Sequence, residues 1–341
     1  MLLVGLLLGL LCVTPFVVIY AFIIRWVDRF EPEPWWLLFC AFVWGALFAT
    51  LGGGITSAIG EALAAGYTGA AAGDPGIDAF GATVLAPICE EGFKGLGVAI
   101  LAGVSAVGLK ELDGPLDGAI YGGIVGLGFT LTEDVLYVGN EFAKEGMAGF
   151  IALVFVRTVL LGLSHCTFTA CTGLGFGIAV ESKSWIVKVA APLGGLLLAM
   201  SMHAFHNVLP TFFGGGGTVL MILSSWVIDV LFFLLLALLV MRDRAIVIRE
   251  LTGEVGGLLH PRELLLITTY VTIGWRNWGA LFSSGWALFR ARRHKQLALV
   301  ELAFIKSRRR RGERGRNLDM KEARLRQEIY LANQRGVWIG N

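Results

Sequence analysis

Charged and hydrogen-bonding side chains interrupt the apolar runs of this 341-residue sequence at four places. The first is the stretch APICEEGFKGLG (86–97), which holds Glu90, Glu91 and Lys94. A charge inside a bilayer costs about 2.5–3.5 kcal/mol on insertion scales, so an ionisable residue at that depth indicates a functional site. Three such residues within five positions are therefore the first candidates for chemistry.

The other three places each combine a carboxylate or an imidazole with further polar groups. They are Glu133 with Asp134, Ser164 with His165, and His203 with His206 and Asn207. Taken alone, each has a simpler explanation, such as an intrahelical ion pair between Glu90 and Lys94, or a hydrogen bond between helices, which we favour for His206. Groups on four separate helices are better explained by one shared cavity.

Two carboxylates, two imidazoles and an amide are suited to hydrolysis of a peptide bond by an activated water. A glutamate acts as general base on the water, while a histidine or a metal ion polarises it. His203 and Asn207 lie one helical turn apart, so both can donate to a single developing oxyanion. His165, His203 and Glu133 are acceptable ligands for a catalytic Zn²⁺ with one open position, although the sequence has no HExxH motif. A mechanism without metal stays open.

The elements that carry these residues are expected to be membrane-spanning helices. The sequence is 56% hydrophobic and 16% charged, whereas soluble domains are about 25% charged, and several apolar runs reach the ~20 residues of a span. This predicts an all-α, polytopic helical membrane protein. We expect seven spans at about residues 2–24, 35–63, 80–109, 118–139, 148–180, 185–209 and 218–241. The fifth is long enough to be strongly tilted or broken, which would make eight.

The distribution of Lys and Arg between the spans predicts the orientation in the cell membrane. The first, third and fifth loops hold Arg25 and Arg29, Lys110, and Lys183 with Lys188. The second and sixth loops hold none, and the fourth holds Lys144 alone. The N-terminus is then outside and the C-terminus in the cytoplasm. At ~1.5 Å per residue, the ionisable groups of the third, fourth and sixth spans lie roughly 9–16 Å below the outer surface.

Residues 242–341 differ in character from the transmembrane catalytic domain expected over residues 1–241. They predict a basic cytoplasmic tail with two helices on either side of Arg308–Arg311. A solvated helical hairpin is the simplest interpretation. The alternative is contact with anionic lipid, because a basic residue near such a surface gains about 1 kcal/mol. No nucleic-acid-binding module accompanies the charges, so nucleic acid is not an expected partner, and nothing predicts an oligomeric state.

The ordered set of motifs over roughly residues 25–210 resembles the PrsW-type intramembrane proteases, which are relatives of the CAAX-prenyl endoproteases and bacteriocin-processing enzymes. The motifs are the turn DRFEPEPWW (28–36), Glu90-Glu91-x-x-Lys94, Phe129-x-x-x-Glu133, His165 and His203-x-x-x-Asn207. The resemblance implies a multi-helix protease that cleaves membrane-anchored proteins. Founding members act on membrane-anchored anti-sigma factors, and the family is often classed as metal-dependent.

The resemblance also implies roles for the site residues. By analogy with the CAAX relatives, Glu90 would activate water and Glu91 would support it or pair with Lys94. His203 and Asn207 would hold the oxyanion. The related enzymes have a histidine where this chain has Glu133. The partner of the base would therefore be Glu133, His165 or a metal ion that they bind.

Two other functions are compatible with intramembrane Glu and His. One is a proton- or ion-coupled transporter, in which these residues form a relay. The hydropathy pattern shows neither an inverted repeat nor paired broken helices, which are typical of transporters. The other is a non-catalytic protein that binds membrane partners through the cavity. The full set of Glu-Glu, His and His/Asn residues favours the protease.

Overall fold

A computed structural model describes residues 1–27, 30–71, 73–109 and 111–339 of the chain. Within these ranges the chain is helical and contains no β-strand, apart from an isolated bridge between Val255 and Leu259. The predicted all-α class is therefore confirmed. The chain divides into two compact units, Met1–Asp28 with Glu33–Ala237, and Arg29–Pro32 with Leu238–Asn341. The functions expected for residues 1–241 and 242–341 stay predictions.

The first unit is a bundle of helices joined or extended by short π-helical segments. The α-helices are α1 (Leu2–Val27), α2 (Trp35–Val43), α3 (Thr50–Thr68), α4 (Pro75–Phe80), α5 (Ala86–Val104), α6 (Pro115–Leu153), α7 (Ser164–Glu181) and α8 (Trp185–Leu251), the last of which belongs to this unit as far as Ala237. The π-helical segments are η1 (Trp44–Ala49), η2 (Gly81–Leu85), η3 (Ser105–Leu109) and η4 (Val154–Leu160).

Two glycines interrupt the long helices at positions where the sequence predicts loops. Gly146 in α6 has φ 69° and Gly214 in α8 has φ 55°, both in a region that favours glycine. Among the described residues, four helical stretches are long and apolar enough to cross a membrane. They are Leu2–Val27, Trp35–Thr68, Pro115–Glu181 and Trp185–Glu254. The chain is thus a multi-pass membrane protein, while the count of seven or eight spans stays a prediction.

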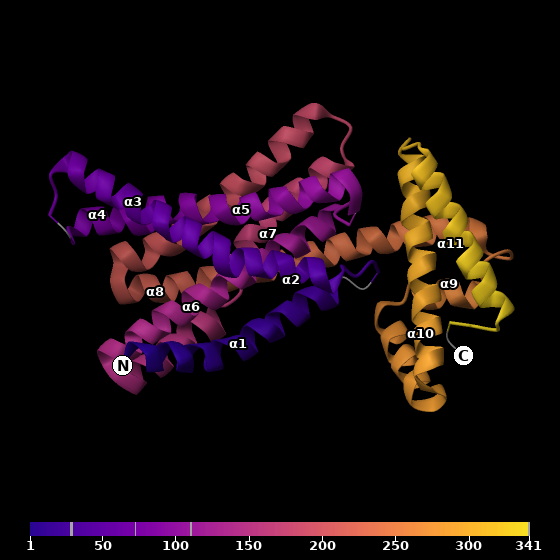
Figure 1. The fold of residues 1–341 in the computed structure, drawn as a ribbon, viewed down its shortest axis with the longest axis horizontal. Coiled ribbons are helices and arrows are strands. Elements are labelled where there is room, and N and C mark those ends of the chain that lie inside the picture. The colour runs from indigo at the N-terminus through magenta and orange to yellow at the C-terminus, as the bar shows by residue number, and fades with distance from the viewer. Residues whose placement is uncertain (28–29, 72, 110, 340–341) are drawn as a thin grey trace. The chain divides into compact units, whose positions relative to one another are not determined.

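Helix α6 is the centre of the first unit, in contact with α1, α7 and η1 (Figure 1). Glycines allow its backbone to approach that of α7 closely. A Cβ atom at Gly118 would overlap the carbonyl oxygen of Gly173, and one at Gly126 would overlap that of His165. Because these positions have no side chain, the carboxylates of α6 come within hydrogen-bonding reach of α7.

The helical run between Gly146 and Glu181 is broken in the middle. Segment η4 ends at Leu160 and α7 begins at Ser164. Leu161 has φ −118° and ψ 1°, which is not helical. The break places His165 in the first turn of α7 and Arg157 in the segment just before it.

The polar turn that precedes α2 is attached to α6. The hydroxyl of Tyr121 donates a hydrogen bond to Glu33, and both side chains are buried. The guanidinium of Arg25, at the end of α1, lies 4.0 Å from the ring centre of Trp35. These contacts fix the connection between the first two long helices.

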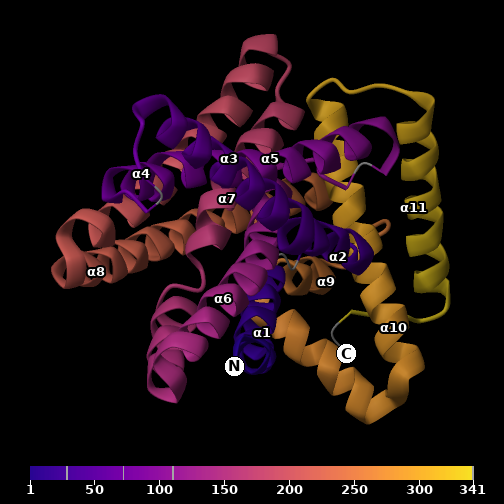
Figure 2. The ribbon, with the colours of Figure 1, turned by 60° about the vertical axis from the view of Figure 1, so that its left-hand side comes forward.

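The second unit contains the last part of α8, η5 (Thr252–Glu254), α9 (Pro261–Ile267), α10 (Tyr270–Arg310) and α11 (Arg316–Gln334). Helices α10 and α11 run side by side as a hairpin (Figure 2). They pack on an apolar core that includes Leu299, Leu302, Leu325 and Ile329.

The arginine run at the end of α10 is paired within the second unit. The ion pairs are Arg308 with Glu313, Arg309 with Asp319 and Glu322, and Arg310 with Glu250. Their charge is therefore partly compensated by the protein itself.

A buried ion pair holds the residues that follow α11. The Lys295 ammonium lies 2.5 Å from Glu263 Oε1 and donates to the carbonyl oxygen of Val337 at 2.9 Å. The Ile339 amide donates to the same Glu263 oxygen at 2.9 Å. Lys295 and Glu263 are 1% and 2% exposed. We call this arrangement the Lys295 clasp.

Candidate active site

Glu91 lies at the centre of a buried polar cluster, and three different residues contact its carboxylate. Its Oε1 accepts from the Lys94 ammonium at 2.7 Å and lies 3.1 Å from His203 Nδ1. Its Oε2 accepts from the Thr169 hydroxyl at 3.1 Å. Glu91 and Lys94 are fully buried, and His203 is 2% exposed. Glu91 thus links α5 to α7 and α8.

Glu90, one residue earlier, has a different environment. Its ion-pair partners are more distant than those of Glu91. Glu90 Oε2 lies 3.7 Å from Lys94 Nζ and 3.8 Å from His203 Nε2. This oxygen is buried and has no hydrogen-bond partner within the described residues. A buried acceptor without a partner is rare, and it indicates a functional role.

Lys94 joins the carboxylates of α5 to the histidine of α7. Its ammonium lies 3.0 Å from His165 Nδ1 and 3.6 Å from the ring centre of Phe129 on α6. An ammonium has only donors, so the neutral His165 ring would accept at Nδ1 and carry its proton on Nε2. Lys94, which the sequence pairs with the glutamates, therefore also sets the tautomer of His165.

Glu133 is shared between His165 and an arginine. Its Oε2 lies 2.8 Å from His165 Nε2 and accepts from the Arg157 guanidinium at 2.6 Å. Arg157 Nε also donates to Asp134 Oδ1 at 3.0 Å, and the Thr158 hydroxyl donates to Asp134 Oδ2 at 2.8 Å. Glu133 and Asp134 are thus both held by the segment that precedes the break before α7.

The two candidate histidines are neighbours. Their ring centres lie 4.9 Å apart, and Phe168 stacks on His203 at 5.6 Å. The second histidine of the His203 motif points elsewhere, because His206 Nδ1 lies 3.1 Å from the hydroxyl of Ser225. That contact joins the two parts of α8 on either side of Gly214, in agreement with the helix-pairing role expected for His206.

Asn207 is not hydrogen-bonded to this cluster. Its side-chain amide donates to the carbonyl oxygen of Ala82, in η2, at 2.8 Å. A donation to a substrate oxyanion would require this amide group to leave Ala82. The structure therefore brings together Glu90, Glu91, Lys94, Glu133, His165 and His203 of the expected residues, and leaves Asn207 engaged beside them.

Glu90, His165 and His203 could hold a metal ion, since one ligand atom from each lies within 4.8 Å of the others. Two imidazoles and a carboxylate fit a catalytic zinc site with an open position. Ligands of a tetrahedral zinc lie ~3.3 Å apart, so the three would have to move closer together. The set expected from the sequence contained Glu133 instead of Glu90, but the contacts with Arg157 and His165 already occupy Glu133.

Several polar residues near these helices were not singled out from the sequence, among them Thr158, which donates to Asp134. Arg157 binds Glu133 and Asp134, as described, and lies within an apolar run. Asp229 accepts a hydrogen bond from the Thr167 hydroxyl at 2.7 Å. It lies in α8, within the part of this helix that belongs to the first unit. Ser225 lies one turn before it. The cost of a charge in a bilayer, which drew attention to Glu90, applies equally to Arg157 and Asp229.

Comparison with known proteins identifies one family. Residues 33–239 match the family described as PrsW family intramembrane metalloprotease. Comparisons with curated proteins and with solved structures find no match. The matched region covers more than half of the chain and contains α2 to α7, most of α8 and all the site residues described above. The chain therefore belongs to the PrsW family of intramembrane metalloproteases and is a peptide hydrolase.

Proposed function

We propose that this protease cleaves membrane-anchored proteins with Glu90 as the general base. The observation that carries the proposal is the contrast between the adjacent glutamates. Glu90 Oε2 is buried without a hydrogen-bond partner among the described residues, whereas both oxygens of Glu91 are engaged. A base needs a free acceptor within reach of the proton that it removes. Glu90 has one, and it faces His203.

A water molecule placed between Glu90 and His203 would be held by both side chains. The distance of 3.8 Å between Glu90 Oε2 and His203 Nε2 allows one water to hydrogen-bond to each. Glu90 would take a proton from the water while the water oxygen attacks the scissile carbonyl. Glu90 would then give this proton to the leaving amine.

Glu91 acts as a positioning residue in this proposal. It holds His203 through Nδ1, so Nε2 faces the Glu90 side. It also neutralises Lys94, which otherwise would be a buried cation beside the base. The oxyanion that develops would be stabilised by Asn207 after its amide leaves Ala82, and by His203 when Nε2 carries a proton.

A zinc ion would be held by Glu90, His165 and His203, and Glu90 would then be a ligand of the ion in place of the base. When bound, zinc supplies Lewis acidity that polarises a carbonyl and eases deprotonation of water. Glu91 and Glu133 would then orient the two ligating imidazoles, as carboxylates commonly do. His165 makes contacts through both ring nitrogens, so its Nδ1 would have to exchange Lys94 for the metal.

The substrate class and topology complete the proposal. The substrate is a single-span, anti-sigma-factor-like membrane protein, and the site lies in the outer half of the cell membrane with the C-terminus in the cytoplasm. Contact between Arg308–Arg311 and anionic lipid stays part of the prediction. The ion pairs of Arg308, Arg309 and Arg310 within the second unit reduce the charge available for it.

Co-expression with a candidate single-span substrate tests the proposal. Wild type should cleave the substrate, whereas Glu90→Ala, Glu91→Ala and His203→Ala should not. Unchanged cleavage by all three variants would refute it. The rival function is separated by the same proteins in liposomes, because a transporter would give pH-dependent ion flux without proteolysis.

A further inference from the structure

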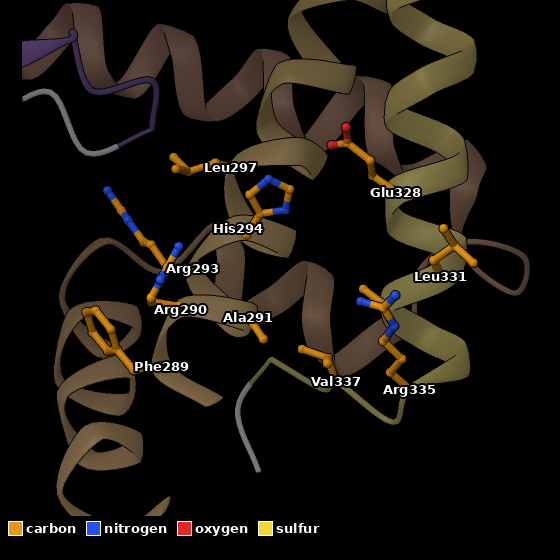
Figure 3. Close-up of a pocket in the computed structure, with 11 residues that line it drawn as sticks. Phe289, Arg290, Ala291, Arg293, His294, Leu297, Glu328, Leu331, Arg335 and Val337 are labelled. Atoms are coloured by element: carbon orange, nitrogen blue, oxygen red, sulfur yellow. The ribbon is translucent and has the colours of Figure 1, made fainter. Parts of the chain in front are cut away.

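The second unit contains a pocket of about 510 Å³ bounded by α10, α11 and the residues after α11 (Figure 3). Small-molecule sites are roughly 300–1,000 Å³ in volume and are mainly apolar with a few polar groups. This pocket has that character, because Leu297, Leu331 and Val337 contribute an apolar lining. Residues of the catalytic cluster take no part in it.

Basic side chains exceed acidic ones around the pocket. Arg290, Arg293 and His294 border it on α10, and Arg335 borders it at the end of α11. The acidic lining residue is Glu328, which extends from α11 toward α10 in Figure 3. Glu328 is already paired with Arg324, at 3.1 Å. The side chains around the pocket therefore leave an excess of positive charge that an anion can bind.

Two of these arginines differ from eight other basic residues of the second unit. Ion pairs engage Lys295, Lys306, Arg308, Arg309, Arg310, Lys321, Arg324 and Arg326. In contrast, the side chains of Arg290 and Arg335 make no ion pair with any residue in the described part of the chain. Both are exposed and border the same pocket. Their guanidinium groups are available to a ligand.

We propose that this pocket binds a phosphate ester that carries an apolar group. Guanidinium groups recognise phosphate oxygens through paired hydrogen bonds, which favours phosphate as the anion. The apolar lining accepts the rest of the molecule. Such a ligand is either the headgroup region of an anionic phospholipid or a soluble phosphate ester.

The Lys295 clasp forms one wall of this pocket in advance. Val337 lines the pocket, and its carbonyl oxygen accepts from the buried Lys295 ammonium at 2.9 Å. A wall that is already ordered does not have to be fixed on binding, which favours affinity. The ligand would in turn stabilise the chain segment after α11.

Titration of the full-length protein in a neutral detergent tests the proposal. The probes are dihexanoylphosphatidic acid, dihexanoylphosphatidylcholine and inorganic phosphate. We expect binding of the phosphatidic acid, with affinity falling roughly tenfold for each arginine lost in the Arg290→Gln/Arg335→Gln variant. Leu331→Asn should weaken binding of the phosphatidic acid and leave that of inorganic phosphate unchanged.

The matched control is Arg314→Gln/Arg316→Gln. It removes the same charge from two exposed arginines of the second unit that do not line the pocket, and it should bind like wild type. Strong binding of inorganic phosphate, lost only in the pocket variant, would identify a soluble phosphate ester as the source. Failure of both anionic probes to bind, or equal loss in the two double variants, would overturn the proposal. Unfolding midpoints without ligand confirm that each variant is folded.

Discussion

Glu90 and Glu91 are adjacent in the sequence and both lie near Lys94 and His203, but only Glu91 is within hydrogen-bonding distance of them. Helical geometry turns their side chains about 100° apart, so Glu91 faces α7 and α8 while Glu90 lies at the edge of the cluster. The exposed fraction of the side chain is 12% for Glu90 and 0% for Glu91. We therefore expect their variants to fail differently, Glu90 in catalysis and Glu91 in the arrangement of the site.

Arg157→Gln should destabilise the protein, because Glu133 and Asp134 would lose their shared cation. Breaking a buried ion pair from one side costs about 3–5 kcal/mol. Arg157→Lys should recover only part of this loss, since an ammonium does not reproduce the guanidinium fork. Thermal unfolding in detergent measures both variants.

The control for Arg157 is Lys144→Gln, which removes an exposed cation from α6. It should unfold at the wild-type temperature. An Arg157→Gln midpoint equal to that of Lys144→Gln would contradict the role given to Arg157.

The zinc-dependent version of the mechanism predicts that metal removal abolishes cleavage. In that version the purified wild-type protein should contain about one zinc per chain, and His203→Ala or Glu90→Gln should lose it. Asn207→Ala should keep the metal, since its amide contacts Ala82 instead of the cluster. Elemental analysis before and after chelation measures this. A metal-free preparation with full activity would exclude zinc and leave the Glu90 proposal to be tested alone.

At this scale the sequence allowed part of the site to be predicted. Helical spacing predicts an ion pair between Glu90 and Lys94, and the structure has these groups 3.7 Å apart. The closer pair, Glu91 with Lys94 at 2.7 Å, is the one that the family resemblance implies. The partners of Glu133 could not be derived in this way. They depend on the break between η4 and α7, which brings Arg157 and His165 to one oxygen from either side.

Helices α6 and α7 approach each other closely where α6 has glycine, and substitution of one of these glycines tests the importance of this contact. Gly126→Ala would force a methyl group against the His165 carbonyl oxygen. Overpacking of this kind typically costs about 1–3 kcal/mol. The variant should unfold at a lower temperature and cleave more slowly, because α7 carries His165 away from Glu133.

Gly103→Ala is the matched control for that variant. A Cβ atom at Gly103 in α5 would meet nothing within 4 Å. It should be neutral or stabilise the protein by up to ~1 kcal/mol, the helix preference of Ala over Gly. Equal behaviour of the two variants would show that the close approach of α6 and α7 does not position the site.

Apolar runs and glycines were sufficient to predict most elements. Residues 148–180 were expected to be tilted or broken because the run is too long for a simple span, and the helix is interrupted between Leu160 and Ser164. The exact position could not be predicted, because Gly162 is one of several glycines in this run and polar residues, Arg157 and His165, lie on either side of it. Packing of Gly162 against Thr158 and Tyr20 selects the position.

The two units of the molecule differ in where their charged side chains lie. The first buries a cluster of charges at the candidate active site, and the second pairs many charges around an apolar core. The Lys295 clasp is an exception, and Lys295→Met should loosen it, because Glu263 would be left buried without its cation. The cost should be about 3–5 kcal/mol.

Limited proteolysis of the full-length protein measures the clasp. Lys295→Met should expose the segment after α11 to cleavage, and Lys295→Met/Glu263→Leu should be less sensitive, since it removes both charges. The surface pair is the control, because Lys321→Met breaks an exposed contact with Glu301 that contributes about 0–1 kcal/mol. Equal protection of wild type and Lys295→Met would contradict the clasp.

Single-turnover cleavage of a single-span substrate in proteoliposomes tests the proposal that Glu90 is the catalytic base. Glu90→Gln keeps the size of the side chain and removes its basicity. We expect a cleavage rate lower by about 10²–10⁴-fold, with an unchanged unfolding temperature, while the exposed Glu145→Gln control cleaves like wild type. Cleavage by Glu90→Gln at the rate of Glu145→Gln would contradict the proposal.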